Sequence, residues 1–94
     1  MSVDVQEKEL FADAKKMLKA IKNRDAAYYK ELETCAQTVD HTLTARQYMA
    51  GYCELHALAI DAEGVGDLAH AYACRSMALV ALIHFVRVVK RKSN

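Results

Sequence analysis

Hydrophobic positions recur with the 3.6-residue period of an α-helix in four separate segments of the chain. In the first segment, apolar side chains form one continuous stripe and lysines occupy the opposite face. The stripe consists of Leu10, Phe11, Ala14, Met17, Leu18 and Ile21. This spacing predicts an amphipathic helix over about 4–22, which begins near the acidic pair Asp4 and Glu7.

Two further segments carry recognisable helix-start signals. Asp25 precedes the second segment as an N-cap, which predicts a helix over about 25–38 and a connection at 39–42. Thr44 and Gln47 have the spacing of a capping box, which predicts a third helix over about 44–63.

Glycines are expected to have two different roles in the third segment. Gly51 lies on its apolar face, where a missing side chain would let another helix approach closely. The Gly64-Val65-Gly66 triplet follows the segment, and a glycine there can supply the left-handed cap that ends a helix.

The fourth segment, about 67–91, is apolar on nearly every side and begins at Asp67. One row recurs at alternating four- and three-residue steps: Leu68, Tyr72, Arg75, Leu79, Leu82, Val86 and Val89. A second row contains Ala71, Cys74, Ala78, Ala81, Phe85 and Val88. Its most apolar stretch, 77–89, is shorter than the roughly 20 residues that span a bilayer. We therefore expect a central helix that is largely buried, and no membrane insertion.

These segments predict a single all-α domain over 1–94, a compact bundle of four helices built from two αα-hairpins, with a short basic tail at 92–94. A chain of 94 residues has room for one hydrophobic core. The absence of proline and the presence of only three glycines argue against a β-sandwich or barrel, which needs many tight turns.

The apolar content also favours self-association. The chain is 53% hydrophobic, and so small a domain buries a limited share of its surface. We expect one side of the fourth helix to face a second copy, with a dimer favoured. The interface candidates are Leu79, Leu82, Phe85, Val86 and Val89.

A net charge of +1 conceals an uneven distribution. Residues 25–67 carry two Lys/Arg against eight Asp/Glu, whereas residues 68–94 carry five basic residues and no acid. The basic candidates for binding phosphate or another charged ligand are Lys15, Lys19, Lys22, Arg87 and Lys90. The first three are expected to be exposed on one helix face. A solvated surface explains the same charges without a ligand.

Cysteines and histidines offer one weak metal candidate. Two cysteines and two histidines fall on the third and fourth helices at three- and four-residue spacing: Cys53, His56, His70 and Cys74. Two Cys and two His on facing helices suit tetrahedral zinc, but their spacing also fits core packing, and we expect no metal. His84, within the apolar run, is expected to be buried.

Three cysteines without a C-x-x-C pair indicate a reducing compartment, and no secretory signal is recognisable, so a cytoplasmic protein is expected. Motifs for nucleophilic, phosphate-binding or metalloprotease chemistry are absent from the sequence. We therefore expect a non-enzymatic protein without a cofactor, a small adaptor, inhibitor or regulator of bacterial or phage type that binds another protein. The alternative is a nucleic-acid or nucleotide binder that uses the basic surface of an oligomer.

Overall fold

The computed structural model is an all-α arrangement of four helices and describes residues 2–37 and 43–93, with side chains described for 6–37 and 43–92. The helices are α1 (Ser2–Arg24), α2 (Ala26–Gln37), α3 (Ala45–Gly64) and α4 (Leu68–Ser93). All four helices predicted from the periodicity are present. The predicted connection at 39–42 lies outside the described residues.

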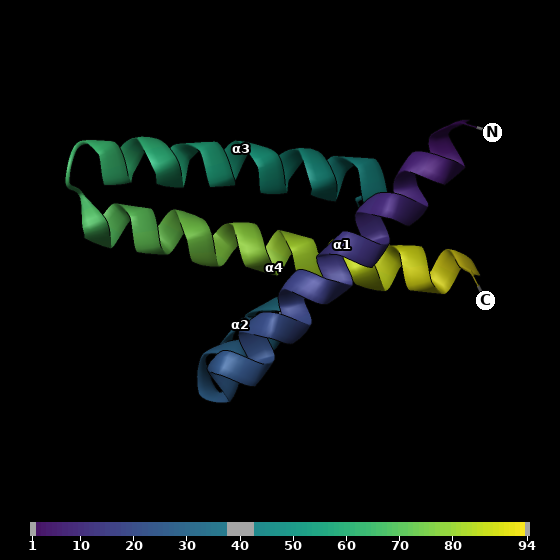
Figure 1. Ribbon diagram of the computed structural model, residues 1–94, viewed down its shortest axis with the longest axis horizontal. Coiled ribbons are helices and arrows are strands. Elements are labelled where there is room, and N and C mark those ends of the chain that lie inside the picture. The colour runs from purple at the N-terminus through teal and green to yellow at the C-terminus, as the bar shows by residue number, and fades with distance from the viewer. Residues whose placement is uncertain (1, 38–42, 94) are drawn as a thin grey trace.

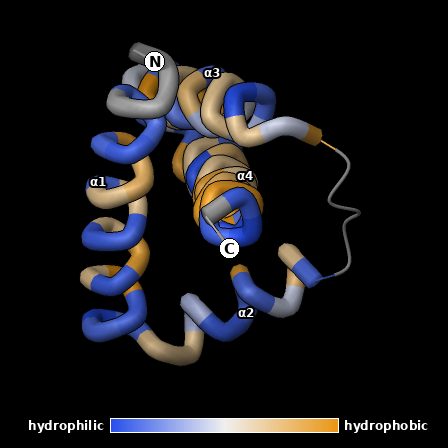
Figure 2. Tube along the Cα trace, turned by 90° about the vertical axis from the view of Figure 1, so that its right-hand side faces the viewer, coloured by the Kyte–Doolittle hydropathy of each residue, from blue (hydrophilic) through white to orange (hydrophobic). Residues whose placement is uncertain are grey.

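Helix α4 is the centre of the structure. Viewed along its length, it has α1, α2 and α3 on three different sides (Figure 2). Helix α3 packs against it along an antiparallel hairpin, while α1 crosses it obliquely (Figure 1). The core contains residues from all four helices, and its largest fully buried side chains are Phe85, Leu82 and His84.

Local signals place the helix ends close to where the sequence predicts them. Thr44 Oγ1 accepts the Gln47 N–H at 3.2 Å, and Gln47 Oε1 accepts the Thr44 N–H at 2.9 Å, which completes the capping box. Asp25 and Asp67 each cap a helix by accepting an N–H three residues later, at 3.1 Å in both cases. These three starts are confirmed because each depends on neighbours in sequence alone.

The turn between α3 and α4 is a Schellman motif. The Asp67 N–H donates to the Ala62 carbonyl at 2.9 Å, and the Gly66 N–H donates to the Glu63 carbonyl at 3.0 Å. Gly66 has a φ of +81°, the left-handed conformation that glycine adopts without a steric penalty. The predicted left-handed glycine cap is therefore confirmed at Gly66.

Three local expectations need correction. Helix α1 begins at Ser2, ahead of the acidic pair expected at its start. Helix α4 continues to Ser93, so Lys92 is helical rather than part of a tail, and its Nζ pairs with Glu7 Oε1 at 2.6 Å. At Gly51 an added Cβ would meet nothing within 4 Å, so this glycine does not serve a close helix approach.

Burial changes sharply along α4. Its second half lies in the core, whereas Leu68 and Tyr72 near its start are 69% and 56% exposed. Helices α1 and α2 cover the second half, and the turn end of the α3–α4 hairpin extends past both of them (Figure 1). Helix α4 is therefore half buried.

Candidate functional site

The turn end of the α3–α4 hairpin is the most unusual surface of the molecule. We call residues 57–73 the distal arm. Its three buried residues are all alanines, Ala59, Ala62 and Ala71, and every other residue in it is exposed. The exposed set includes five large apolar side chains: Leu58, Ile60, Val65, Leu68 and Tyr72.

The alanine seam explains why the arm forms without burying its large side chains. Alanine is the strongest helix former, and its small side chain lets α3 and α4 approach closely. Such a seam buries little apolar area compared with leucine or isoleucine. The distal arm thus places its small side chains inside and its large ones in water, the reverse of the core around Leu82 and Phe85.

The arm is also acidic. It carries Asp61, Glu63 and Asp67 and no lysine or arginine. Arg75, which follows it on α4, forms an ion pair with Glu63, and the side chains of this pair are 45% and 47% exposed. Water screens an ion pair this exposed, and it contributes little to stability.

The predicted interface residues of α4 lie inside the protomer. Leu79, Leu82, Phe85 and Val89 are 2–6% exposed and belong to the core shared with α1, α2 and α3. Val86 is half buried against the same core. The sequence pattern identified side chains that need covering, but the covering elements are this chain's own helices. Self-association itself stays a prediction.

The predicted basic residues lie in different surroundings. Lys15, Lys19 and Lys22 are exposed, as the lysine face of the first helix predicted. Lys15 Nζ lies 4.5 Å from the Phe11 ring centroid, and Lys22 Nζ lies 5.9 Å from that of Tyr29. Both cations therefore cover aromatic rings of their own chain, an arrangement that is favourable without a ligand.

The remaining basic candidates belong to α4. Arg87 is half buried and Lys90 is exposed. Burial raises the pKa of Tyr29 above its usual value, and Glu33 raises it further, while Arg87 opposes both. Two of the basic candidates therefore lie near Tyr29: Lys22 contacts its ring, and Arg87 lowers its pKa. The net shift is upward, so the phenol stays protonated at neutral pH. Binding of a phosphate by the lysine set stays a prediction.

The structure does not assemble the Cys/His set. On α4, His70 Nε2 and Cys74 Sγ are 3.6 Å apart. On α3, His56 lines one surface cleft and Cys53 lines a different one. Within the described ranges, no three Cys, His, Asp or Glu side chains are grouped as metal ligands. The three- and four-residue spacings within each helix therefore do not combine into one set of ligands.

The cysteines and His84 give a mixed result. Cys74 is buried as a small apolar side chain should be, whereas Cys35 and Cys53 are exposed, contrary to their place in the apolar pattern. His84 is 2% exposed, as predicted, and its ring stacks on Tyr48 with centroids 5.0 Å apart.

Helix α4 contains a stretch that meets the length and hydropathy criteria for a membrane span. The stretch Leu68–Lys92 is long and apolar enough to cross a membrane by those criteria alone, and half of its most apolar window is buried inside the protein. The core helix of a soluble protein meets the same criteria, so the expectation of no membrane insertion stays a prediction.

Comparison of the chain with protein-family models, with curated protein sequences and with solved structures gave no match in any of the three. The functional argument therefore depends on the residues themselves. Sequence reasoning missed the distal arm because it assigned Leu68 to an apolar row of a helix that was expected to be largely buried. The signal that was present is the alanine row at 59, 62 and 71, which predicts a seam too thin to cover large neighbours.

Proposed function

We propose that this protein is a small protein–protein interaction module, an adaptor, inhibitor or regulator, and that the distal arm is its binding surface. The observation that carries the proposal is the reversed pattern of the arm: alanines inside, and five large apolar side chains in water. Selection for the stability of this chain alone favours the opposite order.

The exposed side chains give the arm a large apolar surface that a partner could cover. Val65 is 83% exposed and Ile60 is 56% exposed, in addition to Leu68 at 69%. Covering a large aliphatic side chain stabilises a complex by about 1.5–3 kcal/mol before association costs. Several large apolar side chains exposed within one short segment of a small protein are typical of a contact site.

The charge of the arm defines the chemistry of the partner. Asp61, Glu63 and Asp67 belong to the same segment as the exposed apolar side chains, so a partner that combines basic and apolar groups fits best. The last turn of α4 has this charge, with Lys90 and Arg91 both exposed. A two-fold dimer that sets each arm against the other copy's α4 end would pair these charges twice.

Site-specific photocrosslinking tests the proposal. The photoreactive residue p-benzoylphenylalanine replaces Val65 at the tip of the arm, and in a control protein it replaces Lys16, an exposed residue of α1. Both proteins are expressed in the native cells, irradiated, and analysed by mass spectrometry. We expect a defined adduct from position 65 and none from position 16, and we expect Leu68→Gln to reduce its yield.

Sedimentation equilibrium separates the two kinds of partner. Self-association through the arm should give a species of twice the 10.5 kDa chain mass that Leu68→Gln returns to a monomer. A monomer with a heterologous adduct at position 65 identifies a different protein as the partner. Equal adduct yields from positions 65 and 16, or none from either, would contradict an arm-centred interaction.

A further inference from the structure

A cleft of about 520 Å³ lies at the base of the α3–α4 hairpin, where the corner between α1 and α2 meets it. Its floor is apolar and includes Ile21, Ala78 and Leu79. The volume is within the range of about 300–1,000 Å³ that is typical of small-molecule sites. The distal arm borders the cleft at Tyr72, whose ring centroid lies 5.9 Å from that of Tyr28, a lining residue.

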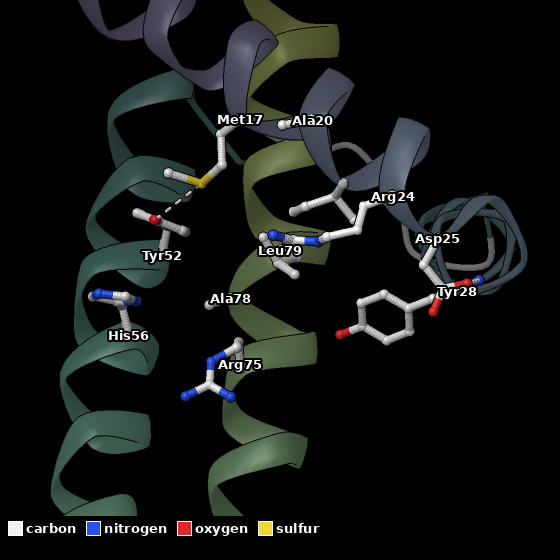
Figure 3. Close-up of a pocket in the computed structure, with 11 residues that line it drawn as sticks. Met17, Ala20, Arg24, Asp25, Tyr28, Tyr52, His56, Arg75, Ala78 and Leu79 are labelled. Carbon is white, nitrogen blue, oxygen red and sulfur yellow. Dashed lines mark hydrogen bonds between the residues drawn. The ribbon is translucent and has the colours of Figure 1, made fainter.

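Two arginines from different helices reach into this cleft. Figure 3 shows the guanidinium groups of Arg24, from the last turn of α1, and Arg75, from α4, in the space between α3 and Tyr28. Among the residues that the structure describes, no carboxylate forms an ion pair with Arg24. Arg75 pairs with Glu63, but both side chains are nearly half exposed, so an incoming anion can replace Glu63 at little cost.

Flat rings form the walls of the cleft. On α3, Tyr52 and His56 stack one turn apart, with centroids at 5.7 Å and ring planes at 16°. Across the cleft from these rings lies Tyr28 (Figure 3). Its hydroxyl shares a 2.7 Å hydrogen bond with Ser76 Oγ, which fixes the phenol ring. Ala78 lines the cleft between these walls, and its small side chain leaves space for a planar group.

Among the other polar groups of the cleft, Tyr52 carries no charge that opposes an anion. Burial raises the pKa of Tyr52 above its usual value, and Cys53 adds to the shift, so the phenol stays uncharged. The Tyr52 hydroxyl donates to Met17 Sδ at 3.6 Å. Asp25 also lines the cleft, and its Oδ1 accepts the Tyr28 N–H at the start of α2. Its negative charge opposes an anion, but Arg24 and Arg75 place two positive charges in the same lining.

We propose that this cleft binds a small aromatic anion, a planar ring carrying a phosphate or carboxylate, with the anionic group held between Arg24 and Arg75. The ring lies over Ala78 and Leu79, between the α3 rings and Tyr28. Arginine suits this role because its planar guanidinium binds phosphate and carboxylate oxygens in pairs. A small-molecule site of this kind goes beyond the proposed interaction function and does not require it.

Isothermal titration calorimetry on the full chain tests the proposal with four probes. Adenosine 5′-monophosphate and 1-naphthoate carry a ring with an anion, adenosine carries the ring alone, and inorganic phosphate carries the anion alone. We expect one or both of the first two to bind about tenfold or more tightly than either single-feature probe. The stronger of the two identifies which combination of ring and anion the cleft prefers.

Three charge variants test the role of the two arginines: two should raise the Kd of the same ligand, and one should lower it. Arg24→Gln and Arg75→Gln should each raise the Kd about tenfold, because each removes a charge-assisted hydrogen bond. Glu63→Gln should lower the Kd, because it frees Arg75. Arg91→Gln is the matched control: it removes the same charge from an exposed position in the last turn of α4 and should change the Kd by less than about twofold.

A steric pair completes the test. Ala20 and Ala12 are both exposed on α1, but only Ala20 lines the cleft. Ala20→Leu should abolish binding and Ala12→Leu should preserve it, with circular dichroism confirming that both proteins are folded. Absence of binding by both aromatic anions at about 10 mM, or an effect of Arg91→Gln equal to that of Arg24→Gln, would overturn the proposal.

Discussion

Two leucines of the same helix should respond very differently to truncation. Leu82 is 2% exposed at the centre of the core, whereas Leu68 is 69% exposed at the start of α4. Replacing each with alanine removes the same atoms from the same kind of helix. The comparison measures directly whether the distal arm contributes to the stability of the fold.

The magnitudes follow from burial. Leu82→Ala removes a fully buried side chain and leaves a cavity, which lowers the free energy of unfolding by about 2–5 kcal/mol. Only about a third of Leu68 is shielded from water, so Leu68→Ala forfeits roughly 0.5–1 kcal/mol of apolar burial, partly offset by the higher helix propensity of alanine. A domain of this size has a total stability of roughly 5–15 kcal/mol, so the first loss is large and the second is small.

Urea unfolding followed by far-UV circular dichroism gives the measurement. With an m-value of about 1–1.5 kcal/mol per molar urea, Leu82→Ala should lower the midpoint by about 1.3–5 M, and Leu68→Ala by less than about 1 M. Repeating the curves at two protein concentrations separates folding from association. Equal midpoint shifts for the two variants would show that the arm is packed in solution, and the argument from exposure would then be wrong.

Three further predictions concern local features. Gly51→Ala should raise the free energy of unfolding by about 0.5–1 kcal/mol because the site is open and helical. Gly66→Ala should lower it by about 1 kcal/mol because the φ of Gly66 is +81°. Thermal unfolding of the two variants should therefore show shifts of opposite sign. Thr44→Ala should cost about 1 kcal/mol and Thr44→Ser much less, and equal effects in urea unfolding would argue against the capping box. The raised pKa values of Tyr29 and Tyr52 mean that the stability they contribute is present below pH 10 and is lost as the pH rises through the folded values; unfolding curves from pH 9 to pH 12 should show this loss, and Tyr52→Phe should reduce it.

The sequence predicted the helices well because their signals are local. Caps at Thr44 and Asp67 act on residues three positions away, and the left-handed Gly66 responds to its own turn. Apolar periodicity likewise depends on the geometry of one helix. None of these signals requires a distant segment of chain, so each can be recognised before the fold is known.

The candidate sites were less predictable because they depend on how the helices rotate against one another. Cys53 and His70 each had a plausible ligand spacing within a helix, but the packing of α3 on α4 turned them to different sides. Arg24 follows the first apolar stripe, and no sequence motif marked it as a binding residue. Its cleft exists only because the corner after α1 brings it to Arg75, a residue 51 positions later in the chain.

The sequence by itself determined that the chain forms four helices, where most of them begin and end, and that α4 is too apolar to stand alone. Only the tertiary structure decided which part of α4 is covered. Helices α1 and α2 cross its second half, so Leu82 and Phe85 are core residues, while Leu68 is left in water. The physical reason is that local hydrogen bonds set a helix, whereas burial is set by segments that are distant in sequence and whose crossing points no periodic pattern encodes.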